Sequence, residues 1–265
     1  MTRNLRVLKM RGRSHGTNEY PFLIDDFGIS VMPVTVSSLE HNVPTERLSL
    51  GVNGIDAMLG AAGGVFQESI TLISGQSGSG KTLLAVAAAQ ACSQAGQRVL
   101  YISLEQPPAE IVRDARNVGM ELKPYIDKGL LEVSSIRAVE LGIEEHIILL
   151  LRQVDAFGAN VLVVDPISSL AELGTASSFK NMVIRLTQAL REWGVTVIFT
   201  ELWYEDAFFH STYPLTALVD TWIKTFYERE GLQMHRRIMV AKSRGIGASD
   251  RVKTLDISGE GILIS

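Results

Sequence analysis

Short apolar runs alternate with longer amphipathic stretches from Ser69 onward. The runs are almost continuously hydrophobic, which is typical of strands buried on both faces of a parallel sheet. They predict strands at Ser69–Ser74, Arg98–Leu104, Leu131–Ser135, Val161–Asp165 and Thr196–Thr200. The stretches between them predict helices at Lys81–Ala95, Pro108–Val118, Glu140–Phe157 and Ser178–Trp193, each followed by a glycine. This alternation predicts an α/β fold with a mainly parallel central sheet flanked by helices.

The pattern changes after Tyr213, where apolar runs follow one another with only short turns between them. Strands are predicted at Val219–Tyr227, Arg236–Ser243, Val252–Ile257 and Gly261–Ile264. Because short turns join antiparallel strands, we expect these runs to extend the sheet in antiparallel fashion.

The start of the chain resembles its end. Val7, Lys9, Arg11, Gly12, Ile24, Gly28 and Ile29 match Val240, Lys242, Arg244, Gly245, Ile257, Gly261 and Ile262 at one constant offset of 233 residues. Such a spacing is one domain length, so we expect residues 1–31 to be the end of a preceding domain of the same kind. Residues 32–46 then form a linker and residues 47–265 a complete domain. Coincidence between two amphipathic β segments is the alternative.

Composition narrows the class of protein. The 265 residues are 46% hydrophobic and 20% charged, an ordinary globular balance, and no apolar run approaches the ~20 residues of a membrane span. The net charge of −4 argues against a mainly electrostatic nucleic-acid binder. The single cysteine, Cys92, cannot form an intrachain disulfide, so we expect a reducing, cytoplasmic setting.

A glycine-rich motif follows the first predicted strand and precedes the first long helix. It comprises Gly75, Gln76, Ser77, Gly78, Ser79, Gly80, Lys81 and Thr82, and so satisfies the P-loop pattern G-x-x-x-x-G-K-[ST]. In such a loop the backbone N–H groups face phosphate oxygens, the lysine reaches the β- and γ-phosphates and the hydroxyl of Thr82 binds Mg²⁺. The motif predicts a RecA-like P-loop site for ATP and Mg²⁺; a glycine-rich turn without a ligand is the alternative.

Acidic and polar residues end three of the other predicted strands. Asp165 is expected to hold Mg²⁺ through a bound water, although an aspartate also ends many strands for turn reasons alone. We expect the strand that ends before Glu105 to lie directly beside the P-loop strand. Glu105 is then expected to act as the catalytic base; the alternative is that Glu105 is a solvated residue at the start of the next helix. Thr200 and Glu201 could sense the γ-phosphate or form a strand-end turn.

Together these residues resemble the KaiC-like ATPases of the RecA superfamily. The resemblance runs from Arg47-Leu48-Ser49-Leu50-Gly51 through the P-loop, Glu105, Asp114-Ala115-Arg116 and Asp165-Pro166-Ile167-Ser168-Ser169-Leu170 to Lys242-Ser243-Arg244-Gly245. It implies a homo-oligomer, a hexameric ring, in which Lys242 and Arg244 act on the nucleotide of the neighbouring subunit. It also implies Thr216 as a phosphoacceptor. Two departures stand out: Gln106 replaces a second glutamate after Glu105, and Ala217 replaces a second acceptor beside Thr216.

We therefore expect a Mg²⁺-dependent ATPase of the KaiC type, with serine/threonine autokinase activity at Thr216 as an open question. A RecA- or RadA-like DNA-dependent ATPase is an alternative, which the net charge disfavours. An ATP-binding signalling module with little turnover, presenting its nucleotide state to a protein partner, is another.

Overall fold

The computed structural model describes residues 4–12, 19–25, 28–31, 44–136, 142–203 and 215–265. Its largest feature is a sheet of nine strands in the order β14-β13-β12-β11-β6-β10-β9-β7-β8. The parallel part consists of β6 (Ile70–Gly75), β7 (Val99–Ser103), β8 (Leu131–Ser135), β9 (Val161–Asp165) and β10 (Thr196–Leu202). The remaining strands are β11 (Thr221–Glu230), β12 (Gln233–Ser243), β13 (Lys253–Ser258) and β14 (Gly261–Ile264). The predicted α/β fold with C-terminal antiparallel strands is confirmed.

Two details of the strand order differ from the expectation. β11 pairs in parallel with β6, and only the pairs from β11 to β14 are antiparallel. β7, whose end leads to Glu105, does not lie beside β6, because β10 and β9 lie between them. That expectation was wrong: crossover helices connect parallel strands without requiring the strands to be neighbours, so lateral order is not set by sequence order.

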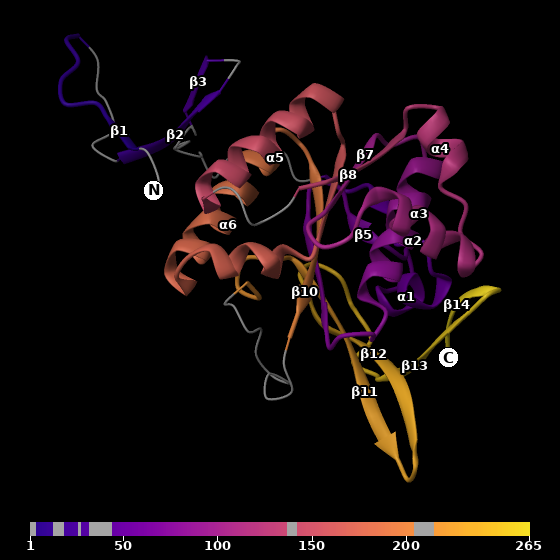
Figure 1. Cartoon of the computed structure of the whole chain (residues 1–265). Coiled ribbons are helices and arrows are strands. Elements are labelled where there is room, and N and C mark those ends of the chain that lie inside the picture. The colour runs from indigo at the N-terminus through magenta and orange to yellow at the C-terminus, as the bar shows by residue number, and fades with distance from the viewer. Residues whose placement is uncertain (1–3, 13–18, 26–27, 32–43, 137–141, 204–214) are drawn as a thin grey trace.

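Helices cover both faces of the sheet (Figure 1). α1 (Asn53–Met58), α2 (Lys81–Gln94), α3 (Pro108–Asn117) and α4 (Lys123–Asp127) lie on one face. α5 (Ile143–Phe157), α6 (Ala176–Glu192) and the 3-10 helix η1 (Ile167–Leu173) lie on the other. Each layer forms its own hydrophobic core against the apolar strands, as expected for a sheet buried on both sides. None of the helices within the described ranges has both the length and the apolar character needed to cross a bilayer.

The longer helices begin where local chemistry favours it. α3 starts with Pro108, whose fixed φ suits the first turn. The backbone N–H of Gly142 donates to the Glu145 carboxylate at the start of α5, and Thr175 caps α6 by accepting from the Ser178 N–H. The shorter elements α1, α4 and the two-stranded ladder of β4 (Arg47–Leu48) and β5 (Val65–Phe66) lack the length for a clear periodic signal.

The described part of the N-terminal segment forms a separate three-stranded sheet of β1 (Asn4–Arg6), β2 (Glu19–Asp25) and β3 (Gly28–Val31). Its register repeats that of the C-terminal strands at the same offset of 233 residues. Asn4 pairs with Pro21 as Arg237 pairs with Thr254, and the β2–β3 pairs all have counterparts between β13 and β14. β2 lies against α5 (Figure 1). The predicted linker 32–46 falls, apart from residues 44–46, outside the described residues.

Candidate functional site

The glycine-rich loop connects the carboxyl end of β6 with the start of α2. Gly80 has φ +103°, and a Cβ added there would lie 2.7 Å from Cδ1 of Ile257. A larger residue would therefore be strained, and the end of the Ile257 side chain on β13 would have to shift. No side chain caps the first turn of α2, so its backbone N–H groups are available to an anion.

Strand β11 and its neighbour β12 hold the loop from outside. The hydroxyls of Ser79 and Thr225 lie 2.7 Å apart, and the Tyr227 N–H donates to Oε1 of Gln76 at 3.0 Å. The Tyr227 hydroxyl and Nε of Arg236 both donate to the Gly78 carbonyl, at 2.8 and 3.2 Å. No local sequence pattern indicates these contacts, because each joins residues about 150 positions apart.

Asp165 ends β9 and is buried, with only 4% of its surface exposed. Tyr101 on β7 donates its hydroxyl to Oδ2 of Asp165 at 2.6 Å, and Thr200 on β10 donates to Oδ1. Thr200 and Glu201 are both fully buried. Because successive side chains of a strand point to opposite faces of the sheet, Glu201 points away from the face that carries Thr200. Of these two residues at the end of β10, Thr200 is therefore the one that contacts Asp165.

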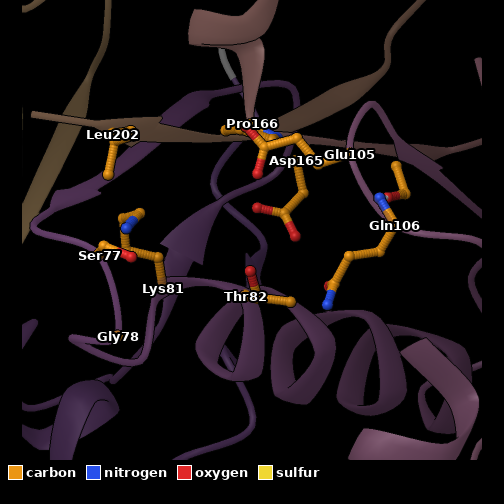
Figure 2. Close-up of a pocket in the computed structure, with 10 residues that line it drawn as sticks. Ser77, Gly78, Lys81, Thr82, Glu105, Gln106, Asp165, Pro166 and Leu202 are labelled. Carbon is orange, nitrogen blue, oxygen red and sulfur yellow. The ribbon is translucent and has the colours of Figure 1, made fainter. Parts of the chain in front are cut away.

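Glu105 reaches the same pocket although β7 lies three strands away from β6. Ser169 on η1 donates to Oε1 of Glu105 at 2.9 Å, which orients this exposed carboxylate. The neighbouring Gln106 also lines the pocket, and its amide points toward Thr82 in Figure 2. The loop after β7 thus contributes one carboxylate and one neutral amide to the site.

The loop and the strand ends enclose a mainly polar cavity of about 210 Å³ (Figure 2). It is lined by Ser77, Gly78, Lys81, Thr82, Ser103, Glu105, Gln106, Asp165, Pro166 and Leu202. A second hollow shares Gly78, Lys81 and Thr82 with it and continues past the loop to Arg236 and Ile257. The two hollows together provide space on both sides of the P-loop.

The charges in the cavity suit an anionic ligand held with a cation. Nζ of Lys81 donates to the Gln76 carbonyl at 2.8 Å. Burial lowers the pKa of Lys81, while the carboxylates of Asp165 and Glu105 oppose this shift. The Thr82 hydroxyl faces the Asp165 carboxylate across the cavity in Figure 2. A hydroxyl and a carboxylate are hard oxygen donors, so this pair fits Mg²⁺.

Lys242 and Arg244 lie away from their own cavity. Lys242 is opposite Trp222, which pairs with Leu72, three residues before Gly75 along β6. Nζ of Lys242 donates to the carbonyls of Thr216 and Val219 at 2.7 and 2.8 Å, at the end of the sheet remote from the loop.

Arg244 is held in the same region. It donates to the Ala217 carbonyl at 3.1 Å and lies 3.7 Å from the Asp220 carboxylate. Both cations therefore hold the turn that contains Thr216.

A glycine-rich loop before a helix, facing an aspartate on the strand two positions away in a mainly parallel sheet, defines the class of RecA-type P-loop ATPase domains. The model of the family described as "ATPase: KaiC" matches residues 48–265. The chain belongs to the KaiC family of ATPases.

Curated relatives agree with this assignment. The chain is 35% identical over 264 residues to the circadian clock protein KaiC2 of Synechocystis sp., covering 98% of this chain and 46% of that protein. It is 30% identical over 261 residues to the circadian clock oscillator proteins KaiC of Acaryochloris marina and of Synechococcus elongatus, covering 98% of this chain and 50% of each. The chain thus spans about half the length of the curated relatives it matches.

Proposed function

We propose that this chain binds ATP together with Mg²⁺ in the P-loop cavity and hydrolyses it. The observation that carries the proposal is the convergence of Lys81, Thr82, Asp165 and Glu105 on one polar cavity of about 210 Å³ at the start of an uncapped helix. The N–H groups of the loop and of the first turn of α2 bind the phosphates. Lys81 adds a positive charge beside the β- and γ-phosphates.

Four other residues of the cavity have roles in this proposal. Thr82 and, through water, Asp165 hold Mg²⁺, which when bound neutralises charge on the phosphate oxygens. Glu105, oriented by Ser169, accepts a proton from the water that attacks the γ-phosphate. Gln106 is neutral and orients polar groups without acting as a base.

We also propose that sites are completed between subunits of a ring. The positions of Lys242 and Arg244 support this, because both cations lie at the end of the sheet remote from their own P-loop and cannot act on the same nucleotide. In a ring they would neutralise charge on the neighbour's γ-phosphate, as an arginine finger does.

Autophosphorylation of Thr216 is a further part of the proposal. The Thr216 carbonyl accepts from Lys242, so its side chain lies at the same edge as the cations proposed to reach the neighbour's γ-phosphate. Transfer of that phosphoryl group to the Thr216 hydroxyl would then compete with transfer to water. Phosphate on Thr216 after incubation with γ-labelled ATP, absent from Thr216→Val, would establish it.

The domain assignment extends to the N-terminal sheet. We propose that residues 1–31 are the end of a preceding domain of the same kind, that residues 32–46 are a linker and that residues 47–265 form the ATPase domain described above. The support is the shared register of β1–β3 and β12–β14. In the C-terminal copy, Ile257 packs against Gly80 of the loop and Ile264 against Gly54 of α1. The matching Ile24 and Val31 are exposed.

Substitution of Lys81 tests the central proposal. Lys81→Ala removes the ammonium that contacts the phosphates, so we expect a roughly 100-fold loss of ATP affinity, about 2.7 kcal/mol, measured with a fluorescent ATP analogue. Lys123→Ala, which changes an exposed lysine on α4, is the control. Equal affinity of the two variants would overturn the proposed site. Multiple-turnover kinetics on the wild type then separate an ATPase from a module that binds ATP with little turnover.

A further inference from the structure

Two buried hydroxyls hold the carboxylate of Asp165, one from each side. Tyr101 on β7 donates to Oδ2 at 2.6 Å, and Thr200 on β10 donates to Oδ1. β9 pairs with both of these strands, so Asp165 lies between them. Each carboxylate oxygen therefore has one donor from the protein and keeps its remaining lone pairs for the cavity.

The position of Tyr101 follows from its strand. It pairs with Val163, two residues before Asp165 on the same face of the sheet, and the length of the phenol side chain carries its hydroxyl along the strand to the carboxylate. The side chain is 1% exposed within the core that contains α2.

A carboxylate bonded at both oxygens cannot turn freely about its side-chain torsions. Figure 2 shows its open edge toward Thr82 on α2. Loss of one hydroxyl would let the carboxylate rotate away from this direction. Groups that orient a metal ligand from behind commonly change metal affinity by 10- to 100-fold when they are removed.

We propose that Tyr101 is a positioning residue that orients Asp165 toward the divalent cation of the bound nucleotide. The inference rests on the proposed binding of ATP with Mg²⁺, and it adds a residue that the P-loop motif does not contain. Thr200 performs the same task from the other side. Tyr101 is buried behind Asp165 and does not line the cavity, so its effect is confined to the contribution that Mg²⁺ makes to binding.

Mg²⁺ titrations of the full chain test this role. With a fluorescent ATP analogue at fixed concentration, we expect Tyr101→Phe to raise the Mg²⁺ concentration needed for half-maximal binding by roughly 10-fold or more. Affinity for the analogue in EDTA is expected to stay unchanged, because the ring and its packing remain. Tyr125→Phe on α4 is the matched control and should titrate like the wild type. Unchanged Mg²⁺ dependence in Tyr101→Phe would overturn the inference.

A double variant separates positioning from general loss of structure. Asp165→Asn should remove most of the Mg²⁺-dependent binding, and adding Tyr101→Phe to it should cause no further change, since the side chain that the hydroxyl orients would no longer carry the charge that holds the cation. A further loss in the double variant would show a structural role instead. Should Tyr101→Phe fail to fold, Thr200→Val tests the same carboxylate from the other strand.

The result on the wild type distinguishes the two proposals. Absence of Mg²⁺-dependent nucleotide binding by the wild type would overturn the proposed function and this inference with it. A clear Mg²⁺ dependence in the wild type that Tyr101→Phe shares in full would overturn only the role of Tyr101.

Discussion

Lys81 and Lys224 are both buried near the P-loop strand, and burial lowers the pKa of each. The groups around the two lysines differ. Lys81 has the carboxylates of Asp165 and Glu105 nearby, which favour its charged form. Lys224 pairs with Ser74 on β6, and its Nζ lies 4.9 and 5.0 Å from the ring centres of Trp203 and Trp222. Burial lowers the pKa of Lys224 from 10.5 to about 8. Aromatic faces attract a cation, but here they do not offset its lost hydration.

The lowered pKa of Lys224 predicts a pH dependence of stability. Between pH 8 and 10.5 the unfolded chain binds more protons at this lysine than the folded chain does. The contribution of Lys224 to the free energy of unfolding therefore increases as the pH rises. Chemical denaturation of the wild type and of Lys224→Met, with exposed Lys128→Met as control, measures the effect. The stability of the wild type relative to Lys224→Met should increase across this window. Parallel curves would contradict the assignment.

At the scale of elements, the hairpin of β11 and β12 contacts the P-loop near one end and the turn with Thr216 near the other. Near the P-loop it contributes Thr225, Tyr227 and Arg236, which hold Ser79, Gln76 and Gly78. The other end of β12 carries Lys242 and Arg244 beside the turn with Thr216. One continuous pair of strands thus extends from the chain's own loop to the cations proposed for the neighbour's site.

Mixing two inactive variants tests this division between subunits. Arg244→Ala lacks the proposed trans cation, and Glu105→Gln lacks the proposed base, so each alone should hydrolyse ATP poorly. In randomly mixed rings at equal amounts, about a quarter of the sites combine an intact Glu105 with an intact neighbouring Arg244. Turnover should therefore recover to about a quarter of the wild-type rate. In the control, the exposed substitution Arg113→Ala on α3 takes the place of Arg244→Ala. If the mixture of Arg244→Ala and Glu105→Gln hydrolysed ATP only at the sum of the two separate rates, a shared site would be contradicted.

At the scale of the whole molecule, the two sets of residues that the proposed site requires lie at separate edges of the sheet. The P-loop cavity opens at the carboxyl ends of the parallel strands, while Lys242 and Arg244 lie toward the opposite ends. A single chain therefore cannot bring both sets to one nucleotide, and the proposed chemistry requires association of several copies.

Light scattering provides the corresponding measurement. The chain has a mass of 29.0 kDa, and we expect ATP with Mg²⁺ to shift the particle toward a mass near six times that value. Lys81→Ala should not respond at the same ATP concentration, because it is expected to bind ATP roughly 100-fold more weakly. A wild-type chain that hydrolyses ATP while staying at 29.0 kDa would contradict the shared site.

Much of the site could be predicted because its signals are local. The spacing from Gly75 to Thr82 and the position of Asp165 at the end of an apolar run are visible within a few residues. Tyr101 and Ser169 could not be found in this way, since each acts on a residue 64 positions distant. For the same reason the sequence pattern did not indicate that β10 and β9 lie between β6 and the strand that leads to Glu105.

The sequence by itself determined the alternation of strands and helices, the phosphate-binding loop and the repeat between the two ends of the chain. These depend on periodicity, on the conformational freedom of glycine and on direct comparison of residues. Only the tertiary structure decided which strands are neighbours, and hence that two hydroxyls enclose Asp165 and that the basic end of β12 lies away from its own loop. Lateral strand order depends on how whole layers pack together, and no short stretch of sequence contains that information.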